Sequence, residues 1–434
     1  MRVAGRFLFG GFLALTAACG SDVTEPGALV ITLNGPPPSL TTSTTLAISG
    51  QVTRTPPAPE QDIVVTVTGG TSPVSDTAAV DGSFAFNVGL TANAQNNLSV
   101  TASDLSGSSA TPVTLAVRHD GTPPGISSMT PAHQSDEVTP AVVTVVFDEP
   151  VVPGSAAVTV RGTAGPVPGA VTVAPDSLGL TFTPTGAFAA NIVHTVTVAA
   201  QDVAGNALTG ASRCFATGGP GITVFTDPAG DIFAFSSPEP ALVPPDVREL
   251  RVATDGTLLH VLLEFAAPRA ISASAPNNLL TAIDFDMDQD GATGFITVKD
   301  TLYSGILPSS GLGAESAIFI EPQGSPADSS AAGLKAEPFA VTQFVRFLPV
   351  FCGNTVGLSV PRTALGDDDG QFDVVGLNLA VNTTATAGTL EDPMPDTGFY
   401  TVGLTAVSRT PVAGVTTSSV PRRGRVAFSL QGRR

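Results

Sequence analysis

"AVVTVVFDEPV", residues Ala141–Val151, is the stretch that decides the fold. It is rich in β-branched residues with a period close to two, and the acidic pair Asp148 and Glu149 follows near its end. Successive side chains of a strand point to opposite faces of a sheet, so the pattern predicts a half-buried β-strand. Similar segments recur about every ten residues from Ala28 onward, between clusters of Pro, Gly, Asn and Asp, which is the spacing of β-sandwiches.

The composition indicates several all-β domains. Of the 434 residues, 45 are Gly and 37 are Pro, while only 13% are charged. This mixture suits many short strands joined by tight turns, and the length predicts about two to four domains because one core rarely serves so long a chain. No internal apolar run approaches the ~18 residues that a membrane-spanning helix needs.

The charge balance bears on partners. The chain carries 37 acidic and 19 basic residues, a formal net charge of −18. A surface this acidic repels phosphate backbones and anionic lipid headgroups. We therefore expect no nucleic-acid partner.

The N-terminus predicts export. Arg2 and Arg6 precede an apolar run that fits a secretory signal peptide at residues 1–18. The run ends in "LTAACGS", which resembles the bacterial lipobox, where small residues precede a Cys that becomes lipidated. This resemblance implies that Cys19 is a lipid anchor and that residues 19–27 form a tether. The alternative is an ordinary signal peptide that happens to contain a Cys.

The lipobox resemblance also implies a location. Acyl chains on Cys19 would hold the protein to a membrane nearly irreversibly, since each buried methylene contributes about 0.8 kcal/mol. By resemblance to bacterial sorting, Gly20 in the next position favours the outer membrane or cell surface over the inner membrane. The membrane is then a partner through the anchor alone.

Residues 28–120 form the first predicted domain. Its strand-like segments begin with "ALVITLNG" and end with "TPVTLAVRHD", and Asp81-Gly82 is a hairpin signal because type I′ turns need positive φ at both centres. The pattern "DGSF" at Asp81–Phe84, "NLSVTASD" at Asn97–Asp104 and a closing "DGTPP" resembles bacterial Ig-like modules. The resemblance implies a β-sandwich.

Residues 121–219 form the second. "VVFDEPV" at Val145–Val151, "LTFTP" at Leu180–Pro184 and "DVAGNAL" at Asp202–Leu208 resemble the Ig-like domain of bacterial S-layer proteins of the SbsA type. In such families these modules are spacers or stalk elements. The resemblance therefore implies that Asp148 and Glu149 are turn residues rather than a catalytic carboxylate pair.

Residues 220–408 form a longer third domain, and residues 409–434 a basic tail. The domain opens with "FTDPAGD", continues with strands joined at Asp255-Gly256, and closes with "DPMPDTGFYTVGL". This order resembles the layout of noncatalytic jelly-roll β-sandwiches, akin to carbohydrate-binding modules. The fold class expected for the whole chain is all-β, with two tandem Ig-like sandwiches followed by a larger jelly-roll-like sandwich.

"DFDMDQDG" in the third domain is the candidate metal site. Asp284, Asp286, Asp288 and Asp290 alternate along the chain before Gly291, and the last three fit the spacing of a calcium loop, where carboxylate oxygens converge and Gly permits a sharp turn. The position of the usual bidentate acid holds Thr297, so a bound Ca²⁺ would need a further ligand from Asp284, Asp300 or the aspartates at 367–369. The alternative is a plain polar loop whose even-numbered Asp side chains point to water.

Two cysteines remain besides the lipidation candidate. Cys214 and Cys352 fall in different predicted domains, and in an oxidising envelope they either pair as a disulfide or stay as two buried thiols.

Catalytic constellations are scarce. The four histidines show no metal-ligand spacing, no nucleophile elbow occurs, and His194 and His260 lie in strand patterns that place them beside a core. We expect a non-catalytic, lipid-anchored cell-surface protein in which Ig-like spacers present a binding or structural β-sandwich to a surface protein or glycan. The alternatives are a carbohydrate-binding accessory protein and a secreted hydrolase. With no Trp and two Tyr, the chain offers few rings on which a sugar could stack.

Overall fold

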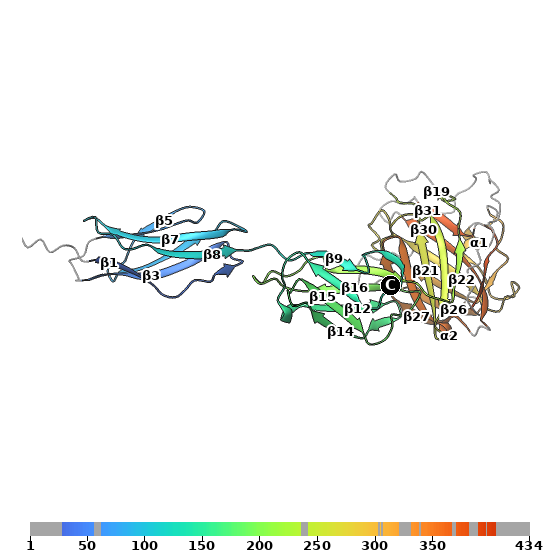
Figure 1. Ribbon diagram of the computed structural model, residues 1–434. Coiled ribbons are helices and arrows are strands. Elements are labelled where there is room, and N and C mark those ends of the chain that lie inside the picture. Colours follow the sequence, from blue (N-terminus) through green and yellow to red (C-terminus); the bar gives the residue numbers. More distant parts are fainter. Residues whose placement is uncertain are drawn as a thin grey trace, which may run out of the picture. The chain divides into compact units, whose positions relative to one another are not determined.

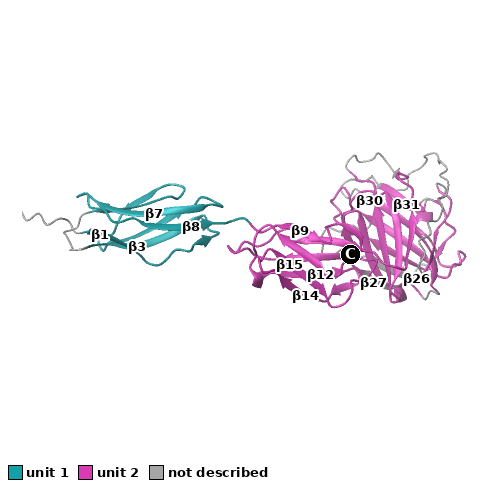
Figure 2. Ribbon diagram, in the orientation of Figure 1, with its two compact units in different colours: residues 1–122 teal, residues 123–434 magenta. Residues whose placement is uncertain are grey.

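The computed structural model describes residues 28–55, 62–235, 242–302, 304, 307–320, 331–337, 340–366, 370–381, 389–395 and 397–404. The chain divides into two compact units, residues 1–122 and residues 123–434 (Figure 2). Their regular structure is almost entirely β-strand, which confirms the predicted all-β class. The α-helices of the described residues, α1 (Val298–Leu302) and α2 (Arg362–Leu365), are far too short to cross a membrane.

Unit 1 contains the first predicted domain as two antiparallel-rich sheets. One sheet has the order β1 (Ala28–Leu33), β3 (Thr45–Thr55), β6 (Ser83–Gly89). The other has the order β2 (Leu40–Thr41), β8 (Val113–His119), β7 (Gln95–Asp104), β4 (Ile63–Thr68), β5 (Val74–Thr77). One core cluster takes alternate residues of both sheets, including Ile48 of β3 and Val100 of β7, so the two sheets form a sandwich.

The hairpin predicted at Asp81-Gly82 is wrong. A turn does occur there, with the Gly82 amide donating to the Ala79 carbonyl at 2.7 Å and a φ of 82° at Gly82. However, β5 before it pairs with β4, whereas β6 after it pairs with β3. The turn therefore carries the chain from one sheet to the other, which a local Asp-Gly signal cannot distinguish from a hairpin.

The second predicted domain, at residues 126–217 of unit 2, is again built of two sheets (Figure 1). One sheet has the order β10 (Ser135–Val138), β17 (Ser212–Thr217), β16 (Val193–Ala199), β12 (Ala157–Gly162), β13 (Gly165–Val167). The other has the order β14 (Gly169–Val173), β15 (Gly179–Pro184), β11 (Val143–Phe147), β9 (Ile126–Thr130). A single turn of 3₁₀ helix, Pro153–Ser155, follows β11.

Strand β11 realises the alternation of the opening stretch. Val143, Val145 and Phe147 are buried, while Thr144 and Val146 point away from the core. The buried side chains join one cluster with residues of β15, β16 and β17. Burial of each such side chain contributes about 1.5–3 kcal/mol, so the alternation fixes the register of this strand.

The third domain, at residues 222–403, is the largest sandwich. Its smaller sheet has the order β18 (Ile222–Thr226), β20 (Val247–Thr254), β21 (Leu258–Phe265), β29 (Thr355–Pro361), β28 (Val350–Cys352). Its larger sheet has the order β19 (Phe233–Phe235), β31 (Thr389–Met394), β30 (Gln371–Val381), β22 (Leu280–Asp286), β25 (Ser316–Ile320), β26 (Ala331–Glu337), β27 (Ala340–Phe347), with β32 (Tyr400–Gly403) also on β30. Two short strands, β23 (Phe295–Ile296) and β24 (Gly313–Ala314), pair beside β22.

The core of this domain lies between its two sheets. One cluster combines Leu250 of β20 and Val261 of β21 with Ile283 of β22 and Val374 of β30. The predicted turn at Asp255-Gly256 joins β20 to β21 as expected, and Gly256 has a φ of 93°. The acidic side chains considered next lie at the end of β22, within β31 and in neighbouring loops.

Candidate functional site

The aspartate series that the sequence singled out begins inside a strand. Asp284 and Asp286 are the last alternate residues of β22, and they are 1% and 2% exposed. The expectation that all the even-numbered Asp side chains point to water is therefore wrong for these two. Asp288 and Asp290 follow in the exposed loop after the strand.

Three carboxylates gather at this loop. One oxygen each of Asp286, Asp288 and Glu315 lies within 4.8 Å of the other two. Glu315 precedes β25 and accepts a hydrogen bond from the Met287 amide at 2.8 Å, and the Thr293 hydroxyl donates to it at 3.1 Å. The sequence identified Asp286 and Asp288 but missed Glu315, because the pairing of β25 with β22 that brings it here is not a local pattern.

The other two members of the series lie outside this group. Asp284 accepts a hydrogen bond from the Val298 amide at 2.8 Å, at the start of α1, while Asp290 accepts one from the Ala292 amide at 3.0 Å within its own turn. Asp300 accepts hydrogen bonds from Ser310 and does not join the group either.

Burial shapes the electrostatics of this region. It raises the pKa of Asp286 to about 6, with a further contribution from the nearby charge of Glu315. Burial likewise raises the pKa of Asp284 to about 7 and raises the pKa of Glu315. One oxygen of Asp286 is buried without a hydrogen-bond partner among the described residues. A cation between these oxygens would offset both the burial and the mutual repulsion.

A second acidic group, which the sequence did not predict, lies elsewhere in the third domain. One carboxylate oxygen each of Asp227, Asp231 and Asp392 lies within 4.8 Å of the other two. Asp227 and Asp231 belong to the "FTDPAGD" stretch at the start of the domain's sequence. Asp392 belongs to β31, near the end of that sequence. The group could not be predicted because Asp392 is far from the other two along the sequence. The one local signal was the pair of acids four residues apart in "TDPAGD".

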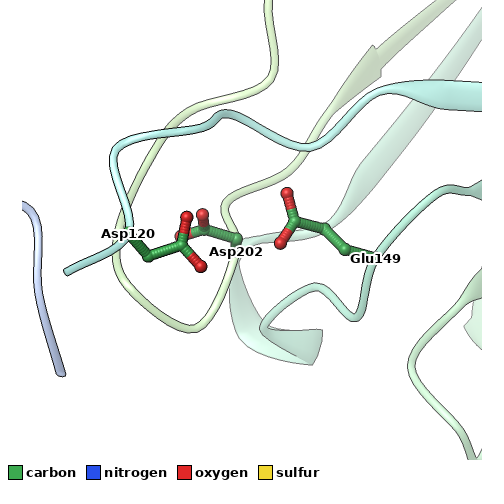
Figure 3. A group of neighbouring side chains, drawn as sticks. All are labelled: Asp120, Glu149 and Asp202. Atoms are coloured by element: carbon green, nitrogen blue, oxygen red, sulfur yellow. The ribbon is translucent and has the colours of Figure 1, made fainter. Parts of the chain in front are cut away.

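The acids of the second domain are turn residues, as the family resemblance implied. Asp202 accepts hydrogen bonds from the Gly205 and Asn206 amides at 2.7 and 2.8 Å, and Asp148 accepts one from the Gly125 amide at 2.7 Å. Glu149 and Asp202 lie on two loops of this domain (Figure 3), which also draws Asp120 of unit 1. Each aspartate holds its own loop closed.

The second and third domains are covalently joined. Cys214 of β17 and Cys352 of β28 form a disulfide with their Cα atoms 5.7 Å apart, which selects the first of the two alternatives left open by the sequence. Around it lies a small cluster of buried residues from both domains: Val193, Cys214, Ala216, Leu262 and Cys352. Gly357 permits this approach, because a Cβ there would lie 2.5 Å from a methyl group of Val193.

An ion cluster closes the same joint. The Arg251 side chain, only 7% exposed, pairs with Asp136 of the second domain at 2.6 Å. It also pairs with Glu249 at 2.9 Å and with Glu264. Burial works to lower the pKa of Arg251, but the hydrogen bonds and charges of these carboxylates more than compensate and raise it. Removal of Arg251 would leave three neighbouring carboxylates without their shared countercharge.

The side chains of Asp255, His260 and Ser359 also form a row of contacts, with Ser359 next to the second domain. The His260 ring contacts the Ser359 hydroxyl at 2.8 Å and Asp255 at 3.7 Å. Ser359 is 7% exposed and its oxygen lies 2.6 Å from the Thr163 hydroxyl of the second domain. The Ser359 hydroxyl therefore contacts both His260 and a residue of the second domain. This arrangement is a structural hydrogen-bond network.

Some predicted features fall on residues that the structure does not describe. They are the signal peptide and Cys19, the aspartates at 367–369, and the basic tail at 409–434. Among the described residues, Phe399 at 41% is the aromatic side chain with large hydrophobic exposure. One ring is a small platform for a sugar, so the carbohydrate-binding alternative gains no support from the described surface.

The comparisons with known proteins bear on the second domain. Residues 120–217 match the family described as the bacterial Ig-like domain. No curated protein is similar to the chain. Among solved structures, a bacterial ice-binding adhesin is 13% identical over 87% of this chain and 97% of its own, with a TM-score of 0.27.

Two further solved structures are similarly distant. Invasin, a bacterial integrin-binding protein, is 12% identical over 89% of this chain and 60% of its own, with a TM-score of 0.21. The N-terminal part of the bacterial S-layer protein SbsC is 15% identical over 52% and 44%, with a TM-score of 0.18. Scores this low assign no function. The family match and the two-sheet architecture identify residues 120–217 as a bacterial Ig-like domain.

Proposed function

We propose that this chain is a non-catalytic bacterial surface protein, anchored by lipid at Cys19, in which Ig-like domains carry the third domain away from the membrane. The observation that carries the proposal is the Cys214–Cys352 disulfide at the joint. Disulfides form and persist outside the reducing cytosol, and this one joins a spacer domain to the domain it carries. A covalent link between the two domains limits their relative motion, which suits a protein with a mechanical role.

The chemistry of the joint supports the same function. The disulfide and the small apolar cluster are buried between the second and third domains, and the buried Arg251 side chain pairs with Asp136 across the same joint. Contacts of this kind restrict rotation, whereas a flexible linker would let the third domain swing freely. The partner that we propose is a surface protein or a glycan. The net charge of −18 argues against nucleic acid.

Localisation of the full chain in a bacterial host tests the proposal. Wild type should fractionate with membranes, enter the detergent phase and be cleaved when intact cells are treated with protease. Cys19→Ala should be exported but recovered in the soluble fraction, with the rest of the chain folded. Recovery of wild type in a soluble compartment without bound fatty acid would overturn the anchor, and resistance to protease on intact cells would overturn the surface location.

Calcium at Asp286, Asp288 and Glu315 is a finer part of the proposal. It is supported by the mutual 4.8 Å limit between these oxygens and by the buried, unpartnered oxygen of Asp286. Millimolar Ca²⁺ added to a chelated sample should raise the melting temperature of wild type. In Asp288→Asn, Ca²⁺ should raise the melting temperature by less than in wild type, because binding at this loop is lost. Equal calcium responses in wild type and variant would refute calcium binding at the loop.

A further inference from the structure

The second acidic group, Asp227, Asp231 and Asp392, lies at the connection that leads from the smaller sheet of the third domain to the larger one. Asp227 directly follows β18 of the smaller sheet, and the loop containing Asp231 leads into β19 of the larger sheet. Asp392 lies within β31, which pairs with β19. A fourth acid, Asp246, immediately precedes β20 of the smaller sheet. The carboxylates therefore reach this point from both sheets.

Of the residues in this group, Asp392 gives the clearest indication that a ligand binds here. Its side chain is 0% exposed. Its Oδ2 accepts a hydrogen bond from the Val247 amide at 2.6 Å, while its Oδ1 has no hydrogen-bond partner among the described residues. The Oδ1 of Asp246, which is 8% exposed, has none either. A buried carboxylate oxygen without a partner costs free energy that the fold must recover from something else.

A cation fits this arrangement. Calcium binds six to eight oxygens at about 2.3–2.6 Å, so two oxygens on one ion can lie up to about 5 Å apart. The oxygens of Asp227, Asp231 and Asp392 are all within 4.8 Å of one another. Magnesium keeps several of its waters, which a group built around a fully buried Asp392 does not favour. The competing solution is a proton shared between carboxylates.

We propose that Asp227, Asp231 and Asp392 bind a Ca²⁺ ion, with Asp246 beside them, and that this ion fastens the two sheets of the third domain to each other. The site is separate from the Asp286 group and does not depend on it. Arg248 pairs with Asp246 at 3.2 Å, so part of the negative charge is already balanced at the edge of the group.

Tyr400 provides a built-in reporter for this site. Its hydroxyl donates a hydrogen bond to the Oδ1 of Asp227 at 2.9 Å, and its ring stacks on Phe225 with 4.6 Å between centroids. The chain has no Trp, and Tyr303 is its one other Tyr. Terbium, which replaces calcium at oxygen sites and is excited by a nearby tyrosine, should therefore emit from this site when Tyr400 absorbs light.

The experiment uses the full exported chain with Tyr303→Phe, after chelation, and titrates in Tb³⁺. We expect tyrosine-sensitised emission that Ca²⁺ displaces. Asp231→Asn and Asp392→Asn should each reduce the emission at least tenfold at a sub-saturating concentration. Asp288→Asn, in the other acidic group, should leave it unchanged. Asp231 lies in a loop rather than in the core, so its variant should fold even where Asp392→Asn does not.

Two results would overturn the proposal. The first is emission that survives in folded Asp231→Asn but disappears in Asp288→Asn, which would assign the ion to the Asp286 group. The second is the absence of sensitised emission from a folded protein, which would leave the shared proton as the explanation for the buried carboxylates.

Discussion

At the scale of single residues, His194 shows how the core of the second domain responds to acid. Its ring stacks on Phe215 with 5.0 Å between centroids and meets Phe188 edge-on. Both ring nitrogens are buried without a hydrogen-bond partner among the described residues. Burial lowers the pKa of His194 to about 4, and the side chain lies in the core as the sequence predicted.

This burial predicts acid sensitivity. The unfolded chain binds a proton at His194 near pH 6.5 and the folded chain only near pH 4, so stability is full above pH 6.5 and falls as the pH drops between these values. The loss should reach at most ~3 kcal/mol. Urea unfolding of wild type and His194→Leu at pH 7 and pH 4.5 measures it. The variant should lose less stability on acidification, and an equal loss in both proteins would contradict this assignment.

At the scale of elements, one turn occurs in both of the first two sandwich domains. Asp104 closes "DLSGS" by accepting hydrogen bonds from the Ser106 and Ser108 amides, both at 2.9 Å. Asp202 closes "DVAGN" by accepting them from the Gly205 and Asn206 amides. The fourth residue of each turn is a glycine with positive φ, 88° at Gly107 and 97° at Gly205. Glycine adopts this conformation without steric cost, which explains its place in both motifs.

The shared turn predicts matched effects in the two domains. Asp104→Ala and Asp202→Ala each leave two amides without their acceptor, and each should destabilise its own domain by about 1–3 kcal/mol. Asp104 also pairs with Arg54, so its replacement should cost more. Asp176→Ala, which removes one hydrogen bond in an exposed turn, is the control and should cost clearly less. Limited proteolysis in urea can follow each domain, and wild-type stability in both Ala variants would refute the role of the turn.

The elements that could be predicted from the sequence are those with a local pattern. Strand β11 and the Asp255-Gly256 hairpin follow from alternation and turn chemistry. The Asp81-Gly82 turn looked identical, yet it joins different sheets, because sheet membership is decided by the core and not by the turn. For the same reason Glu315 and Asp392 escaped notice, since distant strand pairing brings each into its acidic group.

At the scale of the molecule, the contacts at the joint predict that the second and third domains unfold together as one body. The sequence left the pairing of Cys214 and Cys352 open, because whether two distant cysteines meet depends on how whole domains pack. The structure joins them, and it places the Asp136–Arg251 ion pair across the same joint. A domain fixed to its neighbour in this way would transmit orientation as well as distance.

Hydrogen exchange of the full chain in rising urea tests this central claim most directly. In the oxidised wild type, peptides from β11 and from β22 should lose protection at the same urea concentration. In Cys214→Ser/Cys352→Ser, which lacks a cross-link that typically contributes about 2–4 kcal/mol, protection should fall earlier and at different concentrations for the two strands. Separate loss of protection in the wild type, with its disulfide intact, would contradict the claim that the two domains form one body.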